Sequence, residues 1–172
     1  MFENGRWIGP ILDQHIHLDR NNRFLEAIRE FANSGGTGIN LVHKPNFSRL
    51  PESLSEYRDA YEETLQMAKE IRNQFTISVS VILGPHPVAW EHQIHTIGLE
   101  KSTTLHLEAI KLALEYISKG DAVCLGEVGR PHYPVDEKIW EASNSLLLEI
   151  MKLAAEAEVS IQLHVEDNGE KT

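Results

Sequence analysis

The chain has 172 residues, of which 41% are hydrophobic and 24% charged, and its formal net charge is −10. This composition is typical of a globular domain and excludes a disordered or collagen-like chain. The acidic balance argues against a surface that binds nucleic acid or anionic membranes nonspecifically, because such surfaces need clustered Lys and Arg. The single cysteine, Cys124, excludes a disulfide framework and a cysteine-based zinc site. We find no signal-peptide pattern and no apolar run long enough to cross a membrane, so we expect a cytoplasmic protein without a membrane partner.

Five short apolar runs alternate with helical patterns along the chain. Strands are expected within 7–17, 38–43, 75–83, 122–127 and 159–165, and helices near 21–33, 53–73, 103–118 and 136–158. Strands that alternate with helices predict βαβ units and a parallel sheet. A complete eight-fold barrel takes about 250 residues, roughly 31 for each strand-helix unit. The sequence therefore predicts one α/β domain over 1–172, a TIM-barrel-like parallel β/α fold with about five of the eight units present.

Each apolar run ends in a polar side chain of the kind that binds metals. In chain order these side chains are His15 and His17, His43, His86, Glu127 and His164. The carboxyl ends of parallel strands meet at one rim, where α/β proteins build their sites. We therefore expect these six side chains to converge.

Four of these side chains form the expected metal-ligand set. His15 and His17 alternate with Asp13 on one strand, so both rings can reach one ion while Asp13 supports them from the second shell of ligands. Glu127 interrupts an apolar strand, and a buried carboxylate is costly unless it is paired or coordinated. With His164, the set is typical of zinc, manganese or nickel. The alternative is a buried strand with two hydrogen-bonded histidines and a core histidine at His164.

Four segments together resemble the TatD-like metal-dependent hydrolases of the amidohydrolase superfamily. They are ILDQHIHLD at 11–19, ILGPHPVAW at 82–90, LGEVG at 125–129 and IQLHVED at 161–167. The resemblance implies a TIM-barrel hydrolase with one or two divalent ions, whether zinc, manganese, nickel or magnesium. His15 and His17 would bind the first ion, Glu127 would lie between two ions, His164 would bind the second, and His86 would line the substrate pocket. The usual activity of that family is phosphodiester hydrolysis of DNA, often at its ends.

The segment after Glu127 departs from that family. The family commonly has Leu-Asp where this chain has Arg130 and Pro131, with His132 nearby. Arg130 is the expected contact for a substrate phosphate or carboxylate, since its planar fork matches such groups. The alternative is a salt bridge to a neighbouring Glu. His132 and His43 are further expected substrate contacts, although His43 is equally compatible with a capped strand end.

The family also expects a metal-binding His on the sixth strand and an Asp on the eighth, and both positions would lie beyond Thr172. We therefore assign no catalytic residue, and expect these 172 residues alone to turn over no substrate. The open sheet edge predicts self-association. His106 falls within a helical pattern and is expected at the surface.

Three functions remain open at this point. The first is a metal-dependent hydrolase that uses a metal-activated water against a small-molecule or nucleic-acid-end substrate, most plainly a phosphodiester. The second is a carbonyl-centred amidohydrolase or lactonase, because the His-x-His strand is shared across that superfamily. The third is a non-catalytic metal-binding module.

Overall fold

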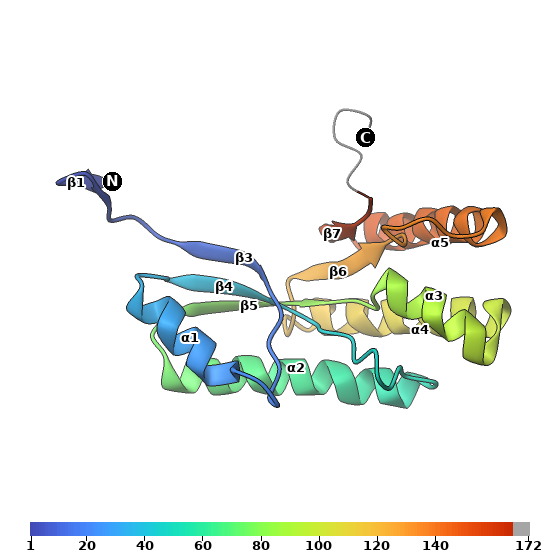
Figure 1. Cartoon of the computed structure of the whole chain (residues 1–172), viewed down its shortest axis with the longest axis horizontal. Coiled ribbons are helices and arrows are strands. Elements are labelled where there is room, and N and C mark those ends of the chain that lie inside the picture. Colours follow the sequence, from blue (N-terminus) through green and yellow to red (C-terminus); the bar gives the residue numbers. More distant parts are fainter. Residues whose placement is uncertain (167–172) are drawn as a thin grey trace.

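A curled sheet of five parallel strands organises the molecule (Figure 1). The computed structural model describes residues 1–166. Each strand of this sheet is hydrogen-bonded to the next in chain order. The strands are β3 (Leu12–Ile16), β4 (Gly38–Val42), β5 (Ser78–Leu83), β6 (Cys124–Gly129) and β7 (Ile161–His164). This arrangement confirms the expected fold, an α/β sheet curled as part of a TIM-like barrel.

Helices connect successive strands of the sheet. They are α1 (Phe24–Asn33), α2 (Leu54–Gln74), α3 (Pro87–Ile97), α4 (Leu99–Ser118) and α5 (Glu137–Glu156). At the start of α2, the Ser53 hydroxyl accepts from the Glu56 N–H, and the Glu56 carboxylate accepts from the Glu52 N–H at 2.7 Å. These bonds satisfy amide groups that a helix start otherwise leaves unpaired.

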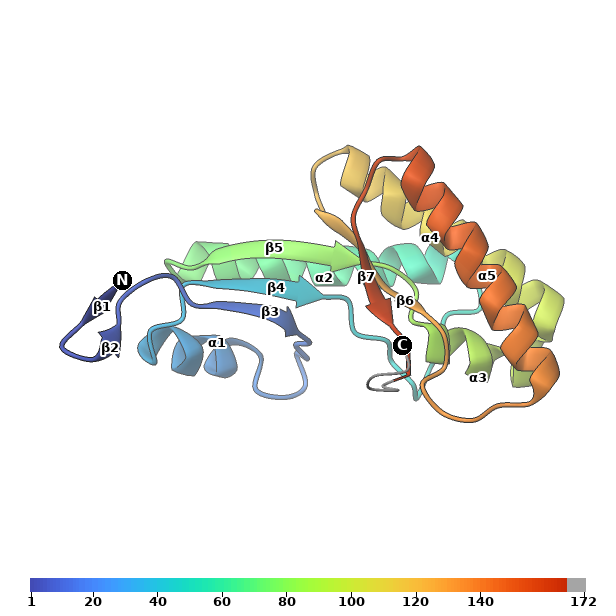
Figure 2. The ribbon, with the colours of Figure 1, turned by 90° about the horizontal axis from the view of Figure 1, so that it is seen from above.

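The core lies between the sheet and its helices. Figure 2 shows α2 running along β4 and β5, while α4 and α5 lie beside the second half of the sheet. Fully buried side chains come from both layers. Among them are Ile28, Tyr61, Ile71, Leu41, Leu83, Ile110, Leu125 and Ile150. Each such side chain stabilises the fold by roughly 1.5–3 kcal/mol relative to exposure. The core therefore supports the sheet from outside and leaves the polar strand ends free to form a site.

Two local predictions differ from the structure, and one helix lies outside the expected ranges. The first apolar run is divided, because Pro10 has no N–H to donate to a sheet: β1 (Phe2–Glu3) and β2 (Arg6–Trp7) form a separate antiparallel hairpin, and β3 begins only at Leu12. The segment after His86 is a full helix, α3. His106 is buried, not at the surface, because α4 contacts α2, α3 and α5 as well as the sheet, so helices cover more than one of its faces.

The sheet curls until its two edge strands approach each other. The Gln162 side-chain amide on β7 donates to the Gln14 carbonyl on β3 at 3.4 Å. Two glycines bring β6 close to β7: a Cβ at Gly126 would lie 2.7 Å from the Gln162 Cβ, and one at Gly129, where φ is +155°, would collide with the His164 carbonyl. Within residues 1–166, no helix is long and apolar enough to cross a membrane.

Candidate metal centre

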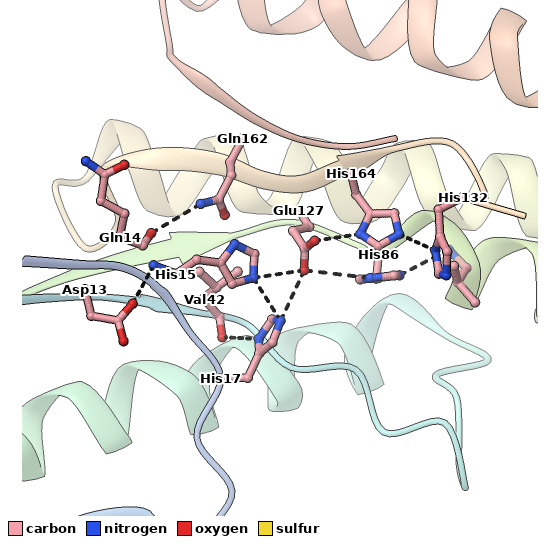
Figure 3. Close-up of polar contacts among 11 residues, drawn as sticks. Asp13, Gln14, His15, His17, Val42, His86, Glu127, His132, Gln162 and His164 are labelled. Carbon is pink, nitrogen blue, oxygen red and sulfur yellow. Dashed lines mark hydrogen bonds and ion pairs between the residues drawn. The ribbon is translucent and has the colours of Figure 1, made fainter. Parts of the chain in front are cut away.

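The strand ends bring four histidines around one carboxylate, that of Glu127 (Figure 3). Glu127 Oε2 lies 3.2 Å from His17 Nε2, 3.4 Å from His15 Nε2 and 3.7 Å from His86 Nε2. Glu127 Oε1 lies 2.7 Å from His164 Nδ1. We call these five residues the Glu127 cluster. Its members come from four of the five strands or from the residues just beyond them, as expected for a site at the carboxyl ends of a parallel sheet.

An irregularity in β3 shapes the first two positions. The pairing of β3 with β4 shifts register between Asp13 and Ile16. Within this stretch, Asp13 Oδ1 accepts from the His15 backbone N–H at 3.0 Å. The His15 and His17 Nε2 atoms then lie 3.1 Å apart. Asp13 therefore supports the site through the backbone of His15 and not through its ring.

A hydrogen bond from His17 to the backbone determines which nitrogen of its ring carries the proton. His17 Nδ1 lies 3.1 Å from the Val42 carbonyl oxygen. A carbonyl can only accept, so Nδ1 carries the proton in the neutral ring and Nε2 is a bare lone pair. Metal-binding histidines commonly show this arrangement, in which a backbone carbonyl orients the ring.

The spacing of these atoms fits a bound divalent cation. A tetrahedral ion with ligands at roughly 2.0–2.1 Å holds neighbouring ligand atoms about 3.4 Å apart. The three distances among His15 Nε2, His17 Nε2 and Glu127 Oε2 are 3.1, 3.2 and 3.4 Å. Acceptor atoms so close repel one another unless a proton or a cation lies between them. A second group with converging ligand atoms is formed by His86, Glu127 and His164, so Glu127 belongs to both.

The charge of Glu127 supports the same interpretation. Burial raises the pKa of this carboxyl, but its close contacts with the His164 and His17 rings outweigh burial and hold its pKa well below the usual range. Within residues 1–166, Glu127 forms ion pairs with histidines and with no Lys or Arg. Its negative charge is therefore available to a cation.

His132 extends the cluster outward from His164. His132 Nδ1 lies 2.8 Å from His164 Nε2, while His164 Nδ1 faces Glu127. His132 is exposed, whereas Glu127 is only 7% exposed. A line of polar contacts thus leads from the buried carboxylate to the surface. The sequence suggested that His132 lies near the site, but its contact with His164 depends on how the loop after β6 folds back onto β7.

The comparisons with known proteins agree with this geometry. The family model described as TatD related DNase matches residues 12–172. The chain belongs to this family. It is also 31% identical over 167 residues to an uncharacterized protein of Methanocaldococcus jannaschii, an alignment that covers 94% of this chain. The chain spans 57% of the length of that relative. No solved structure gives a significant match.

Arg130, at the position where this TatD-related chain departs from the family pattern, has protein partners at both terminal nitrogens of its guanidinium. Its guanidinium donates to Glu166 Oε2 at 3.0 Å and to Asn144 Oδ1 at 2.8 Å. Its Cζ lies 4.6 Å from the centre of the Trp140 ring. The structure thus contains the salt bridge considered as the alternative, and a contact of Arg130 with substrate stays a prediction.

His43 is buried beside the cluster and is held as a neutral ring. The Thr64 hydroxyl donates to the Ala60 carbonyl, so it accepts from His43 Nδ1 at 3.0 Å. Burial, with the nearby His17 and His86, lowers the pKa of His43 to about 3. The second nitrogen of the ring is therefore a hydrogen-bond acceptor. A role of His43 in substrate binding stays a prediction.

A cavity of about 790 Å³ adjoins the cluster and shares His86 with it. It lies between the loops that follow β3 and β4, the N-terminal part of α2 as far as Met67, and the start of α3. Phe47, 48% exposed, stands on this cavity with its ring centre 5.8 Å from that of His86. The charged side chains that line the cavity are the basic Arg20, Lys44 and Arg49 and the acidic Asp19, Glu56, Asp59 and Glu63. The lining therefore carries no excess of positive charge.

Proposed function

We propose that this chain forms the metal-binding part of a hydrolase that cleaves phosphodiester bonds of DNA with one or two divalent ions. The observation that carries the proposal is the convergence of His15, His17 and His164 on the buried, ionised Glu127. Membership of the TatD related DNase family supports the same chemistry. Bound at such a site, a divalent ion supplies a water of lowered pKa and neutralises charge that develops on oxygen.

The residues of this chain divide into two overlapping ligand groups. His15 and His17 would hold one ion together with Glu127, and Glu127 would share a second ion with His164. The backbone carbonyl of Val42 keeps the His17 lone pair directed into the first group. Asp13 keeps the backbone of His15 in place. The chain therefore provides both ligands and the groups that orient them.

The lining of the cavity beside the cluster suits the end of a DNA strand better than a long stretch of DNA. Phe47 presents an exposed ring on which a nucleobase can stack, a contact used widely in single-strand binding. Lys44 and Arg49 are paired with Asp19 and Glu56, so the cavity has few free cations to follow a phosphate backbone. A nucleotide or the end of a DNA strand fits this chemistry better than an extended duplex.

The test combines binding and hydrolysis. The chain is loaded with Mn²⁺, Zn²⁺, Ni²⁺ or Mg²⁺, and its binding and cleavage of an end-labelled oligonucleotide are compared with its turnover of lactone substrates. Binding is measured as well because the family ligands of the sixth and eighth strands are not in this sequence. A Glu127→Gln variant should weaken metal binding more than about 100-fold, beyond the 10- to 100-fold that loss of a ligand's supporting partner costs. The matched control is His95→Asn, an exposed α3 position outside the cluster.

Two results would overturn the proposal. If the metal-loaded chain neither binds nor cleaves the oligonucleotide, the site does not serve DNA. Turnover of lactones with no response to phosphodiesters would assign carbonyl chemistry instead.

A further inference from the structure

His86 begins a helix, and this position determines where its proton lies. It is the N-cap of α3, and the next residue, Pro87, has no N–H. The first free amide of the helix is therefore that of Val88, which donates to His86 Nδ1 at 3.1 Å. A nitrogen that accepts from an N–H carries no proton, so the neutral His86 ring carries its proton on Nε2.

The protonated nitrogen of His86 faces the Glu127 cluster (Figure 3). Nε2 lies 3.7 Å from Glu127 Oε2, which is longer than the roughly 2.7–3.2 Å of an N–H···O hydrogen bond. The ring is 8% exposed and has two aromatic neighbours, with centroid distances of 4.3 Å to His164 and 5.8 Å to Phe47. Its Nε2–H is thus held in place, points at the site and has no close acceptor there among the described residues.

His17 shows the opposite arrangement. Its Nδ1 meets a backbone carbonyl, that of Val42, so its Nε2 is a lone pair. His86 Nδ1 meets a backbone N–H, so its Nε2 is a donor. Both Nε2 atoms lie near Glu127 Oε2, but only that of His17 can bind a metal ion. The backbone group behind each ring therefore separates a ligand from a donor.

We infer that His86 is not a metal ligand and that its Nε2–H donates a hydrogen bond to a substrate oxygen at the Glu127 cluster. This inference rests on the proposed function and names the residue that would hold a phosphoryl oxygen. The distances among His86, Glu127 and His164 alone would suit a metal site. By this inference, Glu127 and His164 are the ligands of that group and His86 is a hydrogen-bond donor. Preorganised donors of this kind act where negative charge develops on oxygen.

Asparagine separates the two functions of His86. Asn is a good N-cap, so His86→Asn retains an acceptor for the Val88 N–H but lacks a donor that reaches the cluster. His86→Ala loses both and should have a lower melting temperature than His86→Asn. His95→Asn, on the exposed side of the same helix, controls for substitution of a histidine on α3.

The first measurement needs no activity. In the metal-free chain labelled with ¹⁵N-histidine, long-range ¹H–¹⁵N spectra report the protonation of each ring nitrogen, and the signals lost in His86→Asn identify His86. We expect an unprotonated Nδ1 and a protonated Nε2, both unchanged when Zn²⁺ is added. A proton on Nδ1, or loss of the Nε2 proton on adding Zn²⁺, would refute the inference.

The second measurement separates ligand from donor. By calorimetry, His86→Asn should bind Zn²⁺ within about threefold of the unsubstituted chain, while His164→Asn should lose more than about tenfold. The zinc-loaded His86→Asn chain should bind the oligonucleotide about tenfold or more weakly, as expected for loss of a hydrogen bond to a charged group. An equal loss of Zn²⁺ affinity in both variants would make His86 a ligand. If the unsubstituted chain binds Zn²⁺ but no oligonucleotide, the proposed function fails, while the spectra and the Zn²⁺ affinities still decide whether His86 is a ligand.

Discussion

Replacing His106 by Leu should stabilise the protein, and increasingly so at low pH. His106 lies on α4, is 1% exposed, and its Nδ1 has no hydrogen-bond partner among the described residues. Burial, with a smaller contribution from His86, lowers the pKa of His106 to about 3 from the ordinary 6.5. Leu is apolar and a better helix former than His, so it removes the unpaired nitrogen without exposing the core.

The pH dependence follows from where the proton binds. Between pH 6.5 and 3 the unfolded chain binds a proton at this site and the folded chain does not, so the free energy of unfolding falls as the pH falls. With these two pKa values, His106 alone lowers the stability by about 2 kcal/mol between pH 7.5 and pH 5. Leaving a buried polar atom unpaired costs a further 1–3 kcal/mol or so at any pH. We therefore expect His106→Leu to gain about 1 kcal/mol or more at pH 7.5 and about 3 kcal/mol at pH 5.

Urea unfolding followed by circular dichroism at pH 7.5 and pH 5 measures both effects. His43, whose pKa is also lowered to about 3, keeps its own acid sensitivity in both proteins, so the comparison isolates His106. His95→Leu serves as the exposed control and should show neither change. An identical fall in stability with pH for the His106→Leu variant and the unsubstituted chain would show that His106 does not remain neutral in the folded protein.

Three further predictions follow from the site and the sheet. A divalent ion at 100 times its dissociation constant should raise the free energy of unfolding by about 2.7 kcal/mol. In thermal melts, a His15→Ala, His17→Ala double variant should lose most of this gain. Equal gains in the variant and the unsubstituted chain would refute the ligand assignment. Gly129→Ala should lower the free energy of unfolding in urea by about 1–3 kcal/mol or more, since its Cβ would collide with the His164 carbonyl. Gly120→Ala is the control, because its Cβ would meet nothing and it reports the cost of positive φ alone. Equal losses of stability in the two variants would contradict the collision. We propose that the chain self-associates through β3 and β7, the edge strands of the sheet within residues 1–166. Leu163→Lys, on β7, should therefore shift sedimentation toward the monomer, and an unchanged sedimentation profile would exclude this edge.

The order of strands and helices could be predicted from the sequence, because both are local patterns. Apolar runs of strand length alternate with segments of helical periodicity along the chain. This alternation is typical of a parallel sheet covered by helices. The positions of His15, His17, Glu127 and His164 at strand ends were equally local, since parallel strands place all such ends at one rim. The convergence of these side chains at the Glu127 cluster thus follows from the topology of the sheet and can be predicted without knowing the side-chain packing.

The hydrogen-bond partners of each histidine were decided only by the tertiary structure. His17, His43 and His86 each end or follow an apolar run, and no sequence pattern shows which ring nitrogen of each carries the proton. Their protons are placed by partners distant in the chain or specific to a turn: the Val42 carbonyl, the Thr64 hydroxyl and the Val88 amide. Likewise, the burial of His106 depends on three helices that meet around α4. Strand ends are set by periodicity along the chain, whereas hydrogen-bond polarity and burial depend on which groups the fold brings into contact.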